Sequence, residues 1–167
     1  MKNISEFIED LERAAIEGAK LLRDQVNGNE KEFKKKGVVF EFQLVAEIYR
    51  TLRNKQYQAG FRRGLFLETN YDGCHVDMVF TDSSGKEHLV EVKPVRTLKK
   101  RDKGLNKGYM DKINKDLRKL KELSNRKIAE KILVVGFIGD TNECGQKEFD
   151  KIVRSTIKVE DVCLITC

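Results

Sequence analysis

Residues Lys131 to Phe137 form an almost uninterrupted apolar run, Lys-Ile-Leu-Val-Val-Gly-Phe, with the length of one β-strand. A strand with one face in water alternates apolar and polar residues, whereas a strand covered on both faces is apolar almost throughout. Strands of the second kind belong to sheets that carry helices on both sides. The run therefore predicts an α/β domain with a central, covered sheet.

Two segments in the first third of the chain have the period of a helix. Apolar residues recur three and four positions apart over residues 3 to 26, and again from about Val38 to Arg53. Polar stretches that contain glycine, at 27–29 and 54–64, end both patterns. The sequence therefore predicts two amphipathic helices, the first of them in an N-terminal extension over residues 1–30.

The period then changes to that of β-strands. Branched and aromatic residues are concentrated at 65–69, 76–81 and 87–93, and the segments between them are rich in Asn, Asp, Gly and Ser. Pro94 follows the third segment. Because proline has no amide hydrogen to donate to a neighbouring strand, we expect the strand to end before it.

The second half of the chain completes an alternating pattern. Apolar residues from Met110 to Leu123 predict a helix, and they are followed by the strand at 131–137, a helix at 144–157 and a strand at 162–166. The resulting order, helix, helix, three strands, helix, strand, helix, strand, predicts one mixed α/β domain over residues 1–167. The outer face of the helix around residue 117 is expected to carry Lys112, Lys115, Lys119 and Arg126.

Composition argues against several classes of protein. The chain is 40% apolar, which suffices for a core without disulfides. Its N-terminus does not resemble a signal peptide, and it contains no run of about 18 apolar residues, so we expect neither secretion by that route nor a membrane span. Its cysteines have no paired spacing, so reduced thiols in a cytoplasmic protein are expected, with zinc binding as the alternative. These cysteines are Cys74, Cys144, Cys163 and Cys167.

The positive charge is concentrated in one segment. The whole chain carries +6, but the residues from Arg96 to Lys127 include 13 Lys/Arg and 4 Asp/Glu, a balance of +9, which leaves −3 for the remainder. A local excess of this size predicts a patch that contacts phosphates, although a solvated helix face is the alternative. DNA is the expected partner. The residues expected to line its approach are Lys99, Lys100, Arg101, Lys103 and Lys107.

The loop between the second and third strands predicts how they pair. A loop of Ser83-Ser84-Gly85 would place Gly85 at the left-handed position that this loop class favours, and would pair Asp82 with Lys86. Continued outward, the ladder pairs Asp77 with Glu91. Since side chains alternate between faces, Asp77, Glu91 and Lys93 should share one face. The other face should be apolar, with Val76, Met78, Phe80, Val90 and Val92.

This arrangement of charges favours a metal site. Two carboxylates directly opposite one another on paired strands have Cβ atoms about 4.5 to 5.5 Å apart and repel. A divalent cation such as Mg²⁺ removes the conflict, since it binds hard oxygen ligands and keeps waters for chemistry. Glu-x-Lys alone is common on exposed strands. The Asp-x13-Glu-x-Lys spacing, the predicted hairpin and the apolar alternation together favour a functional site at Asp77, Glu91 and Lys93.

The segments His-Val-Asp-Met-Val-Phe, at 75–80, and Leu-Val-Glu-Val-Lys, at 89–93, resemble the signature of the PD-(D/E)XK nuclease superfamily. That superfamily includes restriction endonucleases, Holliday-junction resolvases and many repair nucleases. Val76 stands where the motif has proline. The element order over residues 37–138 also resembles the family's αβββαβ core, which leaves 139–167 as a C-terminal helix and strand. The resemblance implies a restriction-endonuclease-like fold and a metal-dependent endonuclease that hydrolyses phosphodiester bonds in DNA.

The resemblance also implies roles for individual residues. Asp77 and Glu91 would bind Mg²⁺, for which Mn²⁺ is expected to substitute, and the backbone carbonyl of Val92 would complete the site. Lys93 would position the attacking water or stabilise charge in the transition state. Many members carry a further glutamate on the helix before the sheet. Glu41, which begins the apolar stripe of that helix, is favoured as this further metal-binding residue over Glu47 and over no helix ligand.

Other functions remain open at the level of sequence. A non-catalytic nucleic-acid-binding or protein-interaction domain could use the same fold, because fold alone does not establish activity. An RNA-cleaving enzyme and a homodimer are also open alternatives. His75 and His88 lie near the predicted hairpin, where packing or a DNA contact is expected of them instead of catalysis.

Overall fold

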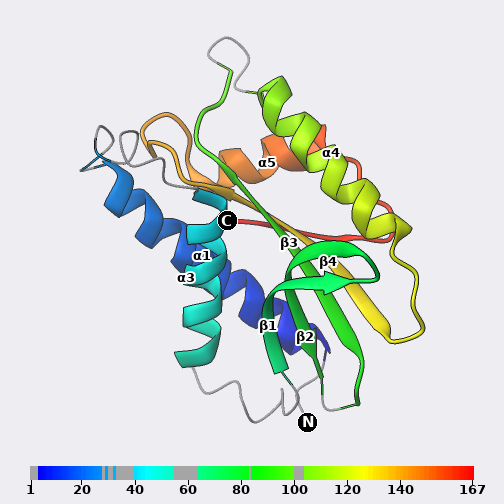
Figure 1. Ribbon diagram of the computed structural model, residues 1–167. Coiled ribbons are helices and arrows are strands. Elements are labelled where there is room, and N and C mark those ends of the chain that lie inside the picture. The colour runs from blue at the N-terminus through cyan, green and yellow to red at the C-terminus, as the bar shows by residue number, and fades with distance from the viewer. Residues whose placement is uncertain are drawn as a thin grey trace.

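A five-stranded mixed sheet lies between two pairs of helices (Figure 1). The computed structural model describes residues 4–27, 29, 32, 40–54, 64–82, 84–99 and 104–167. Both the α/β class and the predicted order of elements are confirmed. The elements are α1 (Ile4–Asn27), α3 (Phe40–Asn54), β1 (Gly64–Tyr71), β2 (Cys74–Thr81), β3 (Glu87–Val95), α4 (Lys107–Glu122), β4 (Ile128–Phe137), α5 (Gln146–Thr156) and β5 (Cys163–Thr166).

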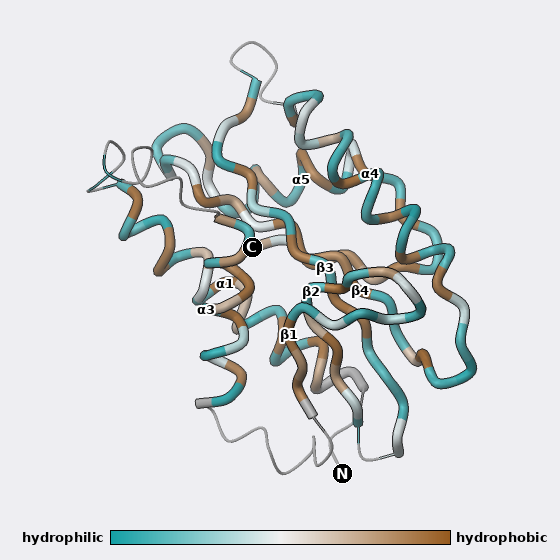
Figure 2. The backbone as a smooth tube through the Cα atoms, in the orientation of Figure 1, coloured by the Kyte–Doolittle hydropathy of each residue, from teal (hydrophilic) through white to brown (hydrophobic). Residues whose placement is uncertain are grey.

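The strands follow one another across the sheet in chain order, β1-β2-β3-β4-β5. The pairs β1–β2 and β2–β3 are antiparallel, and the pairs β3–β4 and β4–β5 are parallel. Residues Ile132 to Phe137 of β4 are all buried, as the apolar run predicted. Figure 2 shows this hydrophobic strand between the helical layers.

Each face of the sheet has its own apolar cluster. On one face, α1 and α3 present a stripe that includes Leu11, Leu44 and Ile48, and it packs on Met78 and Phe80 of β2. On the other face, α4 and α5 supply Ile113, Leu117, Leu120, Phe149 and Val153, which pack with Val79, Leu89, Leu133 and Val135. Among the residues that the structure describes, no helix is long and apolar enough to cross a membrane.

At Gly136, α3 approaches β4 closely. A Cβ atom at this position would lie 2.8 Å from Cδ2 of Leu44 on α3 and 3.1 Å from Sγ of Cys167. Both distances are too short for an ordinary van der Waals contact. The close approach of α3 to β4 therefore depends on the absence of a side chain at residue 136. Gly136 pairs with Pro94, the residue after Lys93.

The register predicted for the β2–β3 hairpin is confirmed for the four pairs next to the loop. The ladder pairs Thr81 with Glu87 and continues to Met78 with Val90. The Asp82 amide donates to the Lys86 carbonyl at 2.8 Å. Gly85 has a φ of 81°, the left-handed conformation that the loop requires. Ser83 lies outside the described residues.

The expectation that the third strand ends before Pro94 is wrong. β3 continues to Val95, with Pro94 opposite Gly136 and Val95 opposite Phe137 of β4. The reason is that β3 pairs with β2 only up to Val90. Among the described strands, only β4 pairs with β3 beyond Val90, so this part of β3 has a partner on one side only. The Val95 carbonyl accepts a hydrogen bond from the Ile138 amide, on the β4 side. The nitrogen of Pro94 therefore faces the opposite edge of β3, where no neighbouring strand needs a hydrogen-bond donor.

Strands β1 and β2 are distorted where Glu68 faces Asp77. The β1–β2 register is the same on both sides of this point, but Glu68 has a φ of 48° and the Glu68–Asp77 pair is not formed. Beyond it, Val76 packs in the cluster under α4 and α5, whereas Met78 belongs to the cluster under α1 and α3. The expectation that Val76 shares a face with Met78 is therefore wrong, because the distortion turns the hairpin tip toward α4.

No disulfide joins any of the four cysteines. Cys144 and Cys167 are buried, and burial raises the pKa of the Cys167 thiol to about 12. Such a thiol is almost entirely protonated at neutral pH and therefore a poor nucleophile. Cys144 and Cys167 thus pack as small apolar side chains.

Candidate active site

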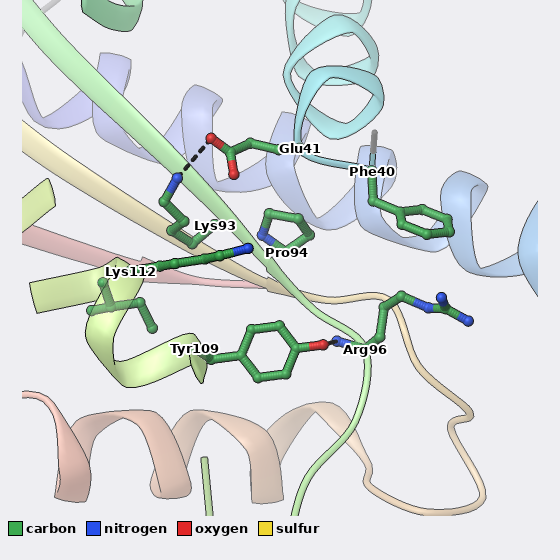
Figure 3. A pocket seen from close by; sticks show the side chains of 8 residues that line it. Phe40, Glu41, Lys93, Pro94, Arg96, Tyr109 and Lys112 are labelled. Atoms are coloured by element: carbon green, nitrogen blue, oxygen red, sulfur yellow. Dashed lines mark hydrogen bonds and ion pairs between the residues drawn. The ribbon is translucent and has the colours of Figure 1, made fainter. Parts of the chain in front are cut away.

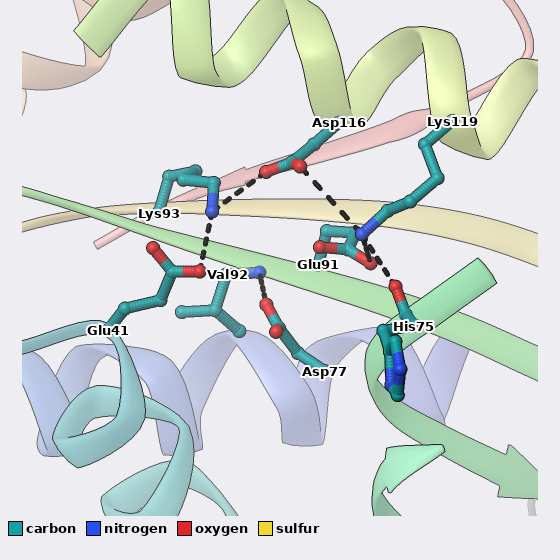
Figure 4. A network of polar contacts seen from close by, with 8 residues as sticks. All are labelled: Glu41, His75, Asp77, Glu91, Val92, Lys93, Asp116 and Lys119. Carbon is teal, nitrogen blue, oxygen red and sulfur yellow. Dashed lines mark hydrogen bonds and ion pairs between the residues drawn. The ribbon is translucent and has the colours of Figure 1, made fainter. Parts of the chain in front are cut away.

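A cavity of about 530 Å³ lies where α3, the distorted part of β2, β3 and α4 meet. It is rich in charged side chains, which come from segments far apart in the sequence. Figure 4 shows the polar network in its wall, with Lys93 and Lys119 on either side of Asp116. The residues that line the cavity are Glu41, Glu68, His75, Asp77, Glu91, Lys93, Lys112, Lys115, Asp116 and Lys119.

Asp77 lies at the point where β2 separates from β3. The predicted pairing of Asp77 with Glu91 is not part of the ladder, which ends one residue earlier at Met78 and Val90. Instead, Oδ2 of Asp77 accepts a hydrogen bond of 2.7 Å from the Val92 amide. The Asp77 carboxylate thus accepts the hydrogen bond that a backbone carbonyl of a paired strand would otherwise accept from Val92. In an extended strand the amide and carbonyl of one residue point to the same edge, so the Val92 carbonyl also faces this gap.

Glu91 is 1% exposed and contacts the Lys119 ammonium, with Nζ at 2.5 Å from Oε1. Burial, and then the neighbouring Asp77 carboxylate, raise the pKa of Glu91 above its ordinary range, and Lys119 only partly opposes this. Burial also raises the pKa of Asp77, against the hydrogen bond from Val92. The two carboxyl groups therefore hold a proton more tightly than isolated carboxylates do.

Lys93 is held between two carboxylates. Its Nζ lies 2.6 Å from Oε1 of Glu41 and 2.9 Å from Oδ2 of Asp116. Burial alone would lower the pKa of Lys93, but its contacts with Glu41 and Asp116 outweigh that effect and raise it. Lys93 therefore remains an ammonium at neutral pH, and its direction is set by groups on α3 and α4.

The two glutamates considered on α3 have different surroundings. Glu41, in the first turn, reaches Lys93 at the cavity wall. Glu47 instead accepts two hydrogen bonds from Arg50, at 2.6 and 3.0 Å. The structure thus brings together Glu41, Asp77, Glu91 and Lys93, and leaves Glu47 outside the network.

Two residues of the site were not found by sequence reasoning. Asp116 is 6% exposed, and Lys119 was expected on the outer face of α4 but turns toward Glu91, so that expectation is wrong. The Lys119 ammonium also donates to the His75 carbonyl at 2.7 Å. A signal for Asp116 does exist, because it occupies a position in the apolar stripe between Ile113 and Leu120, where a carboxylate needs a partner.

A second cavity, of about 270 Å³, adjoins the first along Glu41, Lys93 and Lys112 (Figure 3). Its far wall contains aromatic and cationic groups. The Arg96 guanidinium lies 4.6 Å from the centre of the Phe40 ring, and the Tyr109 hydroxyl accepts a hydrogen bond of 3.2 Å from the Arg96 amide.

The basic segment is described only in part. Lys99 is exposed, and Lys107 is the first residue of α4, not part of the loop. Lys100, Arg101 and Lys103 lie outside the described residues. On α4, the exposed residues Lys112 and Lys115 extend the positive charge from Lys107 to the cavity.

The histidines differ in their surroundings. His88 is 1% exposed, contacts Asp82 at 3.1 Å and packs against Phe7, with ring centres 5.3 Å apart. This agrees with the packing expected for it. His75 is exposed in the hairpin tip at the edge of the cavity.

The donor atoms fit a small, hard cation that keeps most of its own water. Within the described ranges, no three His, Cys, Asp or Glu side chains are gathered closely enough to form a ready metal cage. Asp77 and Glu91, with the Val92 carbonyl, could still supply the few oxygen ligands that Mg²⁺ takes from proteins. In the structure, the Lys119 ammonium contacts one of these oxygens.

No protein-family model matches the chain, and the search of curated proteins found no match.

The raised carboxyl pKa values predict how stability depends on pH. A carboxyl group whose pKa is higher in the folded than in the unfolded protein stabilises the fold below about pH 4, and this contribution is lost as pH rises through the folded value. Between pH 5 and 9, without divalent cations, the wild type should lose on the order of 1 to 3 kcal/mol relative to Glu91→Gln. Urea unfolding at each pH measures this difference, and parallel curves would contradict the burial of the charged pair.

Proposed function

We propose that the chain is a metal-dependent endonuclease with a restriction-endonuclease-like fold, and that it hydrolyses phosphodiester bonds in DNA. The observation that carries the proposal is the convergence of Asp77, Glu91 and Lys93 at the edge of β3 that β2 has left. Burial beside one another raises the pKa of both carboxyl groups, and groups with such shifts are concentrated at functional sites.

Each residue has a role in this proposal. Asp77, Glu91 and the Val92 carbonyl would hold Mg²⁺, which supplies polarisation of the phosphate and of the attacking water. The Lys93 ammonium would donate a hydrogen bond to the attacking water or to the non-bridging phosphate oxygens. Glu41 and Asp116 fix the direction of that ammonium and keep it charged.

A polynucleotide substrate is favoured by the surroundings of the cavity. Lys112 and Lys115 of α4 line the cavity, and Lys107 begins the same helix, so all three can contact phosphates. The adjoining cavity offers Phe40 and Tyr109, and aromatic rings next to cationic groups are a common surface for nucleotide bases.

The proposal is tested by incubating the purified protein with supercoiled plasmid in Mg²⁺, with EDTA in a parallel sample. Nicked or linear plasmid should form only with the metal. Single-stranded DNA and RNA substrates in the same buffers identify an RNA-cleaving enzyme. Protein that binds DNA in Ca²⁺ but cleaves no DNA or RNA in Mg²⁺ or Mn²⁺ would leave a nucleic-acid-binding domain and refute the enzyme.

A further inference from the structure

The ammonium of Lys119 lies among oxygen atoms. Nζ is 2.5 Å from Oε1 of Glu91, 2.7 Å from the His75 carbonyl and 3.8 Å from Oδ1 of Asp116. Figure 4 shows Lys119 reaching down from α4 to these groups. Carboxylate and carbonyl oxygens are also the ligands of hard divalent cations. An internal cation thus contacts a carboxylate that the proposed function assigns to the metal.

The arrangement leaves Lys119 able to move. Its side chain is 24% exposed and lies in the wall of the open cavity, whereas the Glu91 side chain is 1% exposed. Glu91 therefore cannot reach water if the ammonium leaves, and an isolated buried carboxylate is unfavourable. Departure of Lys119 therefore requires that Glu91 takes up a proton or binds another cation.

Lys93 and Lys119 are not equivalent in this respect. Lys93 is held by two carboxylates, those of Glu41 and Asp116. The sequence favours Glu41 as a further metal ligand, but in the structure it contacts Lys93, and the proposed function gives it the role of orienting that ammonium. Lys119 has its shortest contact with Glu91 itself. A cation that binds Asp77 and Glu91 therefore competes with Lys119 and leaves Lys93 in place.

We infer that Lys119 occupies part of the metal site in the free protein, that a divalent cation displaces it from Glu91, and that the released ammonium then binds a phosphate of the substrate. This inference rests on the proposed function for its substrate. The cation replaces the ammonium at the same oxygens, and any proton that the carboxyl pair holds is released to solvent. Because the cavity is bounded by Lys112 and Lys115 as well, the released ammonium joins an existing cationic wall.

The metal exchange is tested on Lys119→Gln, whose amide can still donate to Glu91 and to the His75 carbonyl. Lys115→Gln is the matched control, because it removes the same charge from an exposed side chain of the same helix and cavity. Mg²⁺ and Mn²⁺ are titrated separately into each protein by calorimetry at 150 mM salt. Lys119→Gln should bind the cations about tenfold more tightly than wild type. Lys115→Gln should bind them within about twofold of wild type, because exposed charges are screened.

The second half of the inference is tested by DNA affinity with and without a divalent cation. In Ca²⁺, Lys119→Gln should bind a labelled duplex about fivefold to tenfold more weakly than wild type, because a charged phosphate contact is lost. In EDTA the two should agree within about twofold, since Lys119 is then engaged by Glu91. Lys115→Gln should weaken binding by a similar factor in both buffers.

The outcomes separate this inference from the proposed nuclease function. Equal cation affinities for Lys119→Gln and Lys115→Gln would overturn the inference even if the wild type cleaves DNA. Tighter cation binding by Lys119→Gln alone would support the exchange even if no substrate is cleaved. If Lys119→Gln does not fold in EDTA, recovery of its circular dichroism spectrum in Mg²⁺ supports the inference, and a failure of every divalent cation to restore it refutes the inference.

Discussion

Asp77→Asn and Glu91→Gln should each lower the rate of Mg²⁺-dependent DNA cleavage by about a thousandfold or more, with DNA binding in Ca²⁺ changed by less than about threefold. Each substitution removes a carboxylate that would hold the metal, and so removes the activation of both phosphate and water. In EDTA, affinity for DNA should rise slightly, because a negative charge that repels phosphate has been deleted. Single-turnover cleavage beside a binding titration measures both effects.

The isosteric amide is the appropriate substitution at Asp77. Asn can still accept the hydrogen bond from the Val92 amide, whereas Asp77→Ala would leave that amide without its partner and cost about 1 to 3 kcal/mol of stability. Glu122→Gln, at the exposed end of α4, is the control for loss of a carboxylate and should cleave at the wild-type rate. Retention of full cleavage by Asp77→Asn and Glu91→Gln would place the active site elsewhere.

Lys93→Met should lower cleavage by about 100-fold to 1,000-fold and should also destabilise the protein by about 3 kcal/mol. The first effect follows from loss of an ammonium beside the reacting phosphate. The second follows because Lys93 neutralises the buried Asp116 as well as Glu41. DNA affinity should fall modestly, since phosphate meets the same charge in the ground state. Cleavage rates and urea unfolding measure the two losses separately.

A double variant separates the catalytic loss from the structural one. Adding Asp116→Asn to Lys93→Met removes the buried carboxylate that has lost its nearest cation, so most of the lost stability should return while cleavage stays low. Lys93→Arg keeps the positive charge and should preserve stability better than activity, because a planar guanidinium does not reproduce the geometry of an ammonium. Recovery of cleavage in the double variant would show that Lys93 acts only as a structural counterion.

The local chemistry of the chain predicts much of this architecture. The left-handed Gly85 determines the hairpin register, which the structure reproduces from Thr81 to Met78. Periodicity alone also predicts the layered arrangement around β4. The proximity of Asp77 to Glu91 follows from the same register, although the predicted direct pairing does not form.

The features that could not be predicted depend on tertiary context. Glu68 adopts a left-handed conformation that its residue type does not signal, and this reverses the face on which Val76 packs. Lys119 lies on α4 only three positions from Asp116, and the sequence period cannot show that both turn toward β3. Pro94 can lie within β3 because β2 does not pair with β3 at this point. That depends on the arrangement of the sheet and not on the residue type.

Gly136 has a consequence for how activity could be altered from a distance. It lets α3 lie close to β4, and Leu44, which would meet any side chain there, is three residues after Glu41 on the same helix. A larger residue at 136 would push the start of α3 outward and lengthen the reach from Glu41 to Lys93. Substitutions on the side of the sheet away from α4 can therefore change the geometry of the active site. Variant libraries for altered rate or substrate range should include Gly136 and Leu44, which set the distance between α3 and β4.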